Sequence, residues 1–103
     1  MSKKSELNVA MIGYAFMGAA HSQAWRTAPK FFDLPLDPVM KVLVGRNKAN
    51  LEAAAKRLGW EETSTSVEET VQRDDIDVID VCTPGNTHAE ISIAALQAGK
   101  NVL

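Results

Sequence analysis

Apolar residues in this chain form short continuous runs that alternate with longer stretches in which they recur every three or four positions. The short runs are rich in Val, Ile and Leu, as in strands that are buried on both faces of a sheet. The recurring positions mark one face of a helix. The expected strands lie at 7–13, 39–45, within 61–66, at 76–83 and from 101, and the expected helices at 16–28, 48–58, 67–73 and 87–98.

Polar residues before the helical stretches indicate where the helices begin. Asn47 has the side-chain acceptor that an N-cap requires. Ser66 and Glu69 have the S-x-x-E spacing of a capping box, and Thr87 and Glu90 have the equivalent T-x-x-E spacing. We therefore expect the third and fourth helices to begin at these two boxes.

The segment from Pro29 to Pro38 contains three prolines and predicts a connection, because proline disrupts both helices and central strands. Elsewhere strands and helices alternate in the order β-α-β-α-β-α-β-α-β. This order predicts an α/β fold, a doubly wound parallel sheet with right-handed crossovers and helices on both faces. The run from 101 would be a fifth strand, truncated at its start.

The composition is that of an ordinary globular domain, with 46% hydrophobic and 23% charged residues in a 103-residue chain. A formal net charge of −2, without a long run of Lys or Arg, argues against binding of nucleic acid. No window approaches the ~18 consecutive apolar residues of a membrane span, and the first residues do not resemble a secretory signal. Cys82 is the single cysteine, and we expect a cytoplasmic protein.

The first expected strand runs into a turn with the pattern G-x-A-x-x-G, formed by Gly13, Ala15 and Gly18. In a dinucleotide-binding turn, the first small residue lets the chain leave the strand and the second admits the pyrophosphate. The third lets the helix pack close to the sheet. Free amide groups at the first turn of that helix would attract the diphosphate. The alternative is a tight turn with a purely structural role.

The end of the second strand bears on the choice of cofactor. NAD-binding domains place an acid there, which bonds the ribose hydroxyls of adenosine. This chain has Gly45 at that position, followed by Arg46 and Asn47. Without the carboxylate a 2′-phosphate is not repelled, and Arg46 can pair with it and stack on adenine. We therefore favour NADP over NAD. The alternative is a solvated Arg46 in a loop where Asn47 only caps the next helix.

For the histidines, the cysteine and a group of aspartates, structural roles are weighed against functional ones. His21 lies on the apolar stripe of the first helix and is expected to pack, whereas His88 has either a functional role or a local capping role. Cys82 and the histidines lack the spacing of a metal site, so we expect no metal. The acidic residues between the third helix and the next strand are expected to form a solvated turn: Asp74, Asp75, Asp77 and Asp80.

Three segments, VAMIGYAFMG (9–18), VGRNKANLEAAAKRLGW (44–60) and VIDVCTPGNTHAEISIAALQAGKNVL (78–103), together resemble the N-terminal Rossmann domain of one oxidoreductase family. This is the glucose-fructose oxidoreductase / inositol dehydrogenase / rhizopine-catabolism (Gfo/Idh/MocA) family. Its members are NAD(P)-dependent and act mostly on sugars, inositols and related polyols. The resemblance implies a cofactor site made of Gly13, Ala15, Phe16, Met17 and Gly18 at the pyrophosphate, Gly45, Arg46 and Asn47 at the adenosine end, and Thr83, Pro84, Asn86 and His88 towards the nicotinamide.

The resemblance also implies what these 103 residues lack. In this family the fifth strand leads into a Glu-Lys-Pro motif with the catalytic lysine, and a second domain then binds the substrate. We therefore expect residues 1–103 to be the dinucleotide-binding domain alone, without catalytic residues or activity, and its open sheet to favour a homo-oligomer. The alternatives are a non-catalytic nucleotide-binding or redox-sensing module, and a structural fragment without a ligand.

Overall fold

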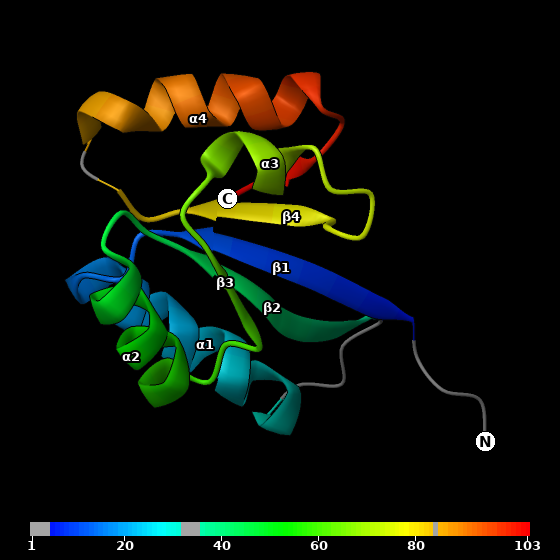
Figure 1. Cartoon of the computed structure of the whole chain (residues 1–103). Coiled ribbons are helices and arrows are strands. Elements are labelled where there is room, and N and C mark those ends of the chain that lie inside the picture. The colour runs from blue at the N-terminus through cyan, green and yellow to red at the C-terminus, as the bar shows by residue number, and fades with distance from the viewer. Residues whose placement is uncertain (1–4, 32–35, 84) are drawn as a thin grey trace.

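A computed structural model describes residues 5–31, 36–83 and 85–103, and it confirms the predicted alternation of strands and helices (Figure 1). Five parallel strands form one sheet in the order β3-β2-β1-β4-β5. Helices α1 and α2 cover one face, and α3 and α4 cover the other (Figure 1). The elements are β1 (Glu6–Ile12), α1 (Phe16–Phe31), β2 (Asp37–Val44), α2 (Lys48–Leu58), β3 (Glu62–Ser64), α3 (Val67–Val71), β4 (Val78–Val81), α4 (Gly85–Gln97) and β5 (Asn101–Val102).

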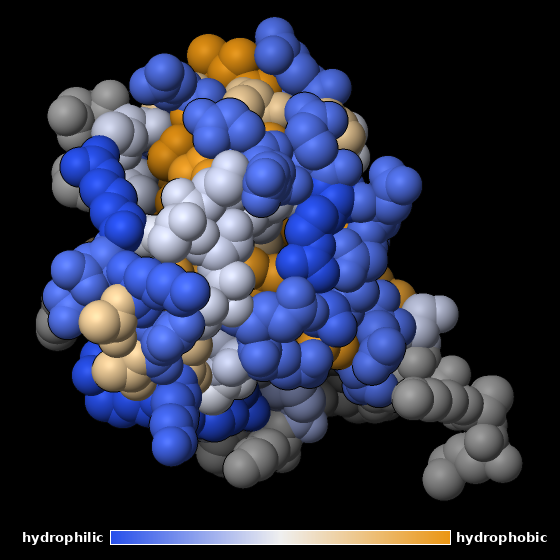
Figure 2. All heavy atoms as spheres, viewed as in Figure 1, coloured by the Kyte–Doolittle hydropathy of each residue, from blue (hydrophilic) through white to orange (hydrophobic). Residues whose placement is uncertain are grey.

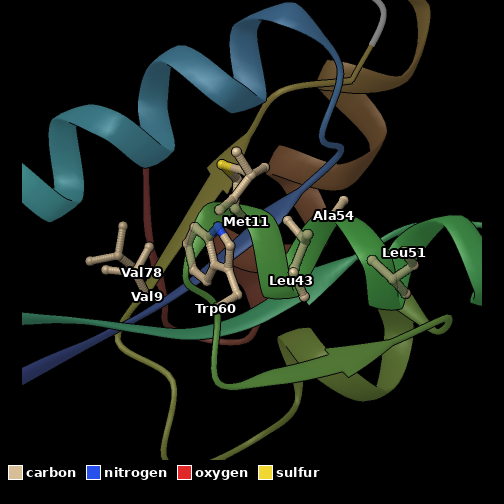
Figure 3. Packing of buried hydrophobic residues seen from close by; sticks show 9 residues of the cluster. Val9, Met11, Leu43, Leu51, Ala54, Trp60 and Val78 are labelled. Atoms are coloured by element: carbon tan, nitrogen blue, oxygen red, sulfur yellow. The ribbon is translucent and has the colours of Figure 1, made fainter.

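The central strand β1 explains why the sheet is buried on both sides. It pairs with β2 along its whole length, from Glu6 opposite Asp37 to Ile12 opposite Val44, and with β4 over its second half. Alternate residues of these strands point to opposite faces. One face packs against α2 and the Trp60 ring (Figure 3), and the other packs against α3 and α4. The core on the first face contains Val9, Met11, Leu43, Leu51 and Ala54. The core on the second face contains Ala10, Ile12, Val42, Val71 and Ala95.

The helix caps are partly as predicted. The side chain of Asn47 accepts a hydrogen bond from the Asn50 amide at 3.0 Å, so the predicted cap of α2 is confirmed. Ser66 likewise accepts from the Glu69 amide at 3.1 Å, which confirms the start of α3. However, the Ser66 amide donates to the side chain of Ser64 rather than closing a reciprocal box with Glu69.

The capping box predicted at Thr87 and Glu90 is wrong. Helix α4 begins two residues earlier, at Gly85, so Thr87 lies inside its first turn. There its hydroxyl donates to the Thr83 hydroxyl at 2.7 Å. The T-x-x-E motif therefore predicted the start of the helix to within two residues, although Thr87 is not the N-cap of α4.

The proline-rich segment is shorter as a connection than predicted. Helix α1 continues through Pro29 to Phe31. Pro29 has no amide hydrogen and so removes one hydrogen bond from the helix, and only two residues of α1 follow it. At the other end, Pro38 belongs to β2. The Asp37 amide bonds towards β1, so the Pro38 nitrogen faces the other side, where β3 has not yet begun.

The surface is mostly polar, with apolar residues gathered where α4 lies (Figure 2). Ile93 and Leu96 on this helix are more than half exposed. No helix within the described residues has the length and apolar character needed to cross a bilayer.

Candidate functional site

The turn after β1 is built around Gly13. This residue has φ +96°, a left-handed conformation that favours glycine. Its amide donates to the Val44 carbonyl at 2.9 Å, and a β-carbon on it would lie 2.9 Å from the Cys82 carbonyl oxygen. Gly13 therefore sits between the ends of β2 and β4, where no other residue fits without movement. The predicted role of the first glycine as a tight exit from the strand is confirmed.

Gly18 brings helix α1 close to this turn. A β-carbon at Gly18 would lie 2.7 Å from the Gly13 carbonyl oxygen and 3.2 Å from the Met11 side chain. The distance to the backbone is shorter than side chains tolerate, so the close packing predicted for this position is confirmed. The start of α1 is therefore fixed directly over the end of β1.

Among the side chains that the structure describes, none caps the first turn of α1. Helical hydrogen bonding begins with the Ala19 amide, which donates to the Ala15 carbonyl at 2.9 Å. The amides of Phe16, Met17 and Gly18 precede it and have no acceptor within the helix. The methyl group of Ala15 cannot accept them, in contrast to the Asn47 side chain at the start of α2. An anion placed here would meet several amide donors and the positive end of the helix dipole.

A hollow of about 520 Å³ opens at the carboxyl ends of β1, β2 and β4. Ligands of open α/β sheets bind at this edge, outside the strand ends. Five of the predicted cofactor-binding residues line the hollow: Gly13, Gly45, Arg46, Asn47 and Thr83. Tyr14, Thr65 and Thr87 also line it, and the sequence analysis did not select them.

The other residues predicted to bind the cofactor lie near the hollow or outside the part of the chain that the structure describes. Ala15 and Met17 are exposed at the start of α1, and Gly18 is buried beneath the turn. Pro84 lies outside the described residues, as do the side chains of Phe16 and Asn86.

His88 makes a local contact. Its Nε2 atom lies 2.5 Å from the Thr83 carbonyl oxygen, so the ring donates to the backbone just before α4. This contact is a local one, and the functional role that the sequence left open for His88 stays a prediction. The contact ties the first turn of α4 to the end of the loop that follows β4.

Arg46 is exposed at the rim of the hollow and has no ion-pair partner among the residues that the structure describes. Beside it, the Tyr14 ring packs over Gly45, and the Leu51 side chain also lies close to the glycine. Where the sequence predicts the adenosine end, the hollow is lined by a glycine, an aromatic ring and a guanidinium that has no ion-pair partner among the described residues.

One polar cluster was missed by the sequence analysis. Asp80 is completely buried, so its assignment to a solvated turn is wrong, whereas Asp74, Asp75 and Asp77 are exposed as predicted. Its carboxylate accepts hydrogen bonds from His21 Nδ1 and Trp25 Nε1, both at 2.9 Å. The position of Asp80 inside the otherwise apolar strand β4 was the available signal, but a buried aspartate is uncommon enough to be passed over.

The same cluster includes Cys82, whose Sγ lies 3.3 Å from His21 Nδ1 and 3.5 Å from Asp80 Oδ1. These three side chains could in principle hold a metal ion, a grouping that the sequence spacing did not predict. Hydrogen bonds within the cluster account for each of these contacts. Burial, together with the Asp80 charge, raises the pKa of the Cys82 thiol to about 12. Cys82 is therefore a protonated thiol at neutral pH.

Comparison with known proteins agrees with this geometry. Residues 7–103 match the family model described as "Oxidoreductase family, NAD-binding Rossmann fold". The levoglucosan dehydrogenase of Pseudarthrobacter phenanthrenivorans is 43% identical over 98 residues, which are 94% of this chain and 25% of that protein. The chain thus spans about a quarter of the length of that relative.

Two solved structures superpose closely on the chain. An oxidoreductase domain protein from Kribbella flavida has a TM-score of 0.92 at 59% identity, covering 95% of this chain and 26% of that one. A levoglucosan dehydrogenase solved in complex with NADH has a TM-score of 0.92 at 42% identity, covering 95% and 27%. With the glycine turn, the strand order and the family match in agreement, the chain belongs to the Gfo/Idh/MocA oxidoreductase family and forms its NAD-binding Rossmann domain.

Proposed function

We propose that the hollow at the strand ends binds a nicotinamide dinucleotide, with its diphosphate on the first turn of α1. The observation that carries this proposal is the set of α1 amides without an acceptor within the helix, which begins directly after a turn whose left-handed, confined first residue is Gly13. Gly13 lets the chain leave β1 tightly and Gly18 lets α1 pack against that turn, because neither carries a β-carbon. The NADH complex of a levoglucosan dehydrogenase supports the assignment.

Each part of the site has a defined task in this proposal. The amides of Phe16, Met17 and Gly18 donate to the diphosphate and hold it against the helix dipole. Arg46 and Asn47 meet the adenosine end, and Thr83 lines the path towards the nicotinamide. The bound cofactor supplies the hydride chemistry, and this chain contributes binding and orientation.

For the longer protein we propose a dehydrogenase that transfers a hydride between the nicotinamide and a carbinol carbon of a sugar, inositol or related polyol. A levoglucosan dehydrogenase solved with NADH and levoglucosan supports this substrate class. The resemblance to the family assigns the hydroxyl proton to the lysine of the Glu-Lys-Pro motif, and substrate binding to a second domain. The expected homo-oligomer stays a prediction. A non-catalytic module is the competing candidate, and turnover by the longer protein separates the two.

We also propose that the site prefers NADP to NAD. Gly45 places no carboxylate against a 2′-phosphate, and the exposed Arg46 has no ion-pair partner among the described residues. A guanidinium can form two parallel hydrogen bonds to a 2′-phosphate, whereas the 2′-hydroxyl of NAD has no charge and cannot pair in this way.

Isothermal titration of the chain with NADPH and with NADH tests both proposals. We expect saturable binding of both, tighter for NADPH by about tenfold, which corresponds to about 1.4 kcal/mol. The Arg46→Ala variant should remove most of this preference, whereas Arg57→Ala, an exposed arginine at the end of α2, should leave it unchanged. Binding of neither dinucleotide would refute the function. Equal binding, or an unchanged ratio in Arg46→Ala, would refute the preference alone.

A further inference from the structure

We propose that Tyr14 is a specificity-determining residue, because its ring keeps an acidic side chain out of position 45. This inference rests on the cofactor-binding function proposed above. It assigns a role to a residue between the two small residues of the glycine turn, which the sequence pattern treats as variable. The consequence is a site whose adenosine end cannot offer the ribose a carboxylate at position 45.

The geometry around Gly45 carries the proposal. A β-carbon at this position would lie 2.4 Å from Tyr14 Cε1 and 3.1 Å from Tyr14 Cδ1. The same β-carbon would lie 3.3 Å from Leu51 Cδ1. Real β-carbons do not approach other atoms to 2.4 Å, so any side chain at position 45 requires the Tyr14 ring to move. Gly45 has no left-handed backbone, so the ring, and not a backbone requirement, explains the glycine.

The Tyr14 ring is held where it is by two features. The preceding residue, Gly13, is fixed by its hydrogen bond to Val44 and by its contact with the Cys82 carbonyl. The ring itself is partly buried and packs against the hydrophobic cluster that contains Leu43 and Leu51. Moving it would expose apolar surface and open the space over Gly45. Steric exclusion at position 45 is therefore a stable property of the fold.

The chemical consequence concerns the ribose next to adenine. NAD-specific domains use an acid at this position to accept hydrogen bonds from both ribose hydroxyls. With that acid excluded, the nearest charged group at the rim of the hollow is Arg46, which attracts a 2′-phosphate. Tyr14 thus favours NADP indirectly, by deciding which side chain can meet the ribose. The phenol ring also forms part of the wall of the hollow.

A set of four variants tests the inference: Gly45→Asp, Tyr14→Ala, the double variant Tyr14→Ala/Gly45→Asp, and the control Tyr14→Phe/Gly45→Asp. Thermal unfolding reports the steric conflict, and titration with NADPH and NADH reports the preference. We expect Gly45→Asp alone to lower the melting temperature, and the Tyr14→Ala background to restore part of that loss. The Tyr14→Phe background keeps the ring and should restore none.

The titrations complete the test. In the double variant Tyr14→Ala/Gly45→Asp, the ratio of the two dissociation constants should move towards NADH by about tenfold or more, the effect of a ribose-binding carboxylate. The inference is overturned if Gly45→Asp is as stable as the wild type. It is also overturned if Gly45→Asp alone shifts the ratio of the two dissociation constants as far as the double variant does. It is equally overturned if the double variant keeps the wild-type ratio. If the wild-type chain binds neither dinucleotide, the proposed function falls, and the specificity role falls with it.

Discussion

The Nδ1 atom of His21 lies 2.9 Å from both carboxylate oxygens of Asp80, across a sequence separation of 59 residues. This contact joins the second turn of α1 to the centre of the sheet in β4. Trp25, one turn further along α1, adds a second donor at 2.9 Å. A buried carboxylate is tolerated only where such donors compensate for lost hydration. The cluster therefore fixes the helix that carries the proposed diphosphate site against the strand that leads to Thr83.

Replacing Asp80 should destabilise the fold more than replacing any exposed aspartate nearby. Asp80→Ala leaves the His21 and Trp25 donors without their acceptor, and we expect a loss of about 3 kcal/mol in the free energy of unfolding. Urea denaturation measures it. Asp74→Ala is the control, because Asp74 is exposed, and should change stability by less than about 0.5 kcal/mol. Similar losses in the two variants would contradict the role given to the cluster.

The glycine turn can be tested against a second glycine of the same backbone type. Gly13 and Gly99 have φ +96° and +80°, but only Gly13 has backbone atoms where a β-carbon would go. Gly99→Ala should cost the left-handed strain alone, about 1–2 kcal/mol. Gly13→Ala should cost that strain plus the clash with Cys82, about 3 kcal/mol or more. Equal costs, measured by chemical denaturation, would mean that the turn is not confined by β4.

The N-cap of α2 is a local interaction with a local test. Asn47→Ala removes the acceptor of the Asn50 amide and should lower stability by about 1 kcal/mol. Asn50→Ala keeps that amide, and alanine is the better helix former, so this variant should be neutral or slightly stabilising. The melting temperatures of the two variants measure how much the Asn47 cap stabilises the protein. A stable Asn47→Ala protein would show that the cap contributes little.

Cys82 should be unreactive in the native protein. Its pKa is raised from 9.0 to about 12, first by burial and then by Asp80, so the folded state holds the proton more tightly than the unfolded state. The stability that this contributes is present below about pH 9 and is lost as the pH rises towards 12. At pH 8 the native thiol should react with iodoacetamide far more slowly than the urea-unfolded chain. Equal rates would contradict the burial and charge described here.

The fold was predictable from the sequence because its signals are local. Apolar runs, glycine stops and capping residues such as Asn47 and Ser66 depend on neighbours within one turn. The errors occurred where local chemistry competes with packing. Pro29 is tolerated near the end of α1 and Pro38 at an unpaired side of β2, and Thr87 lies inside the first turn of α4, where it bonds the Thr83 hydroxyl.

The site was predictable only in part. The geometry of the glycine turn and the place of Gly45, Arg46 and Asn47 at the hollow could be predicted because both depend on fixed spacing after a strand. The partners of Asp80 could not, since His21 and Trp25 lie more than fifty positions away and meet it only when α1 packs on β4. The same is true of Tyr14 and Gly45, whose contact depends on the adjacency of β1 and β2.

The most direct test of the central claim is an amide-resolved ¹⁵N NMR titration of the 103-residue chain with NADPH. If the first turn of α1 holds the diphosphate, the largest saturable shifts will fall on the amides of Ala15 to Gly18, with smaller ones at Gly45 and Arg46. If these amides do not respond, or the shifts gather at the far hollow beside Arg26 and Pro29, the diphosphate is not bound where we place it.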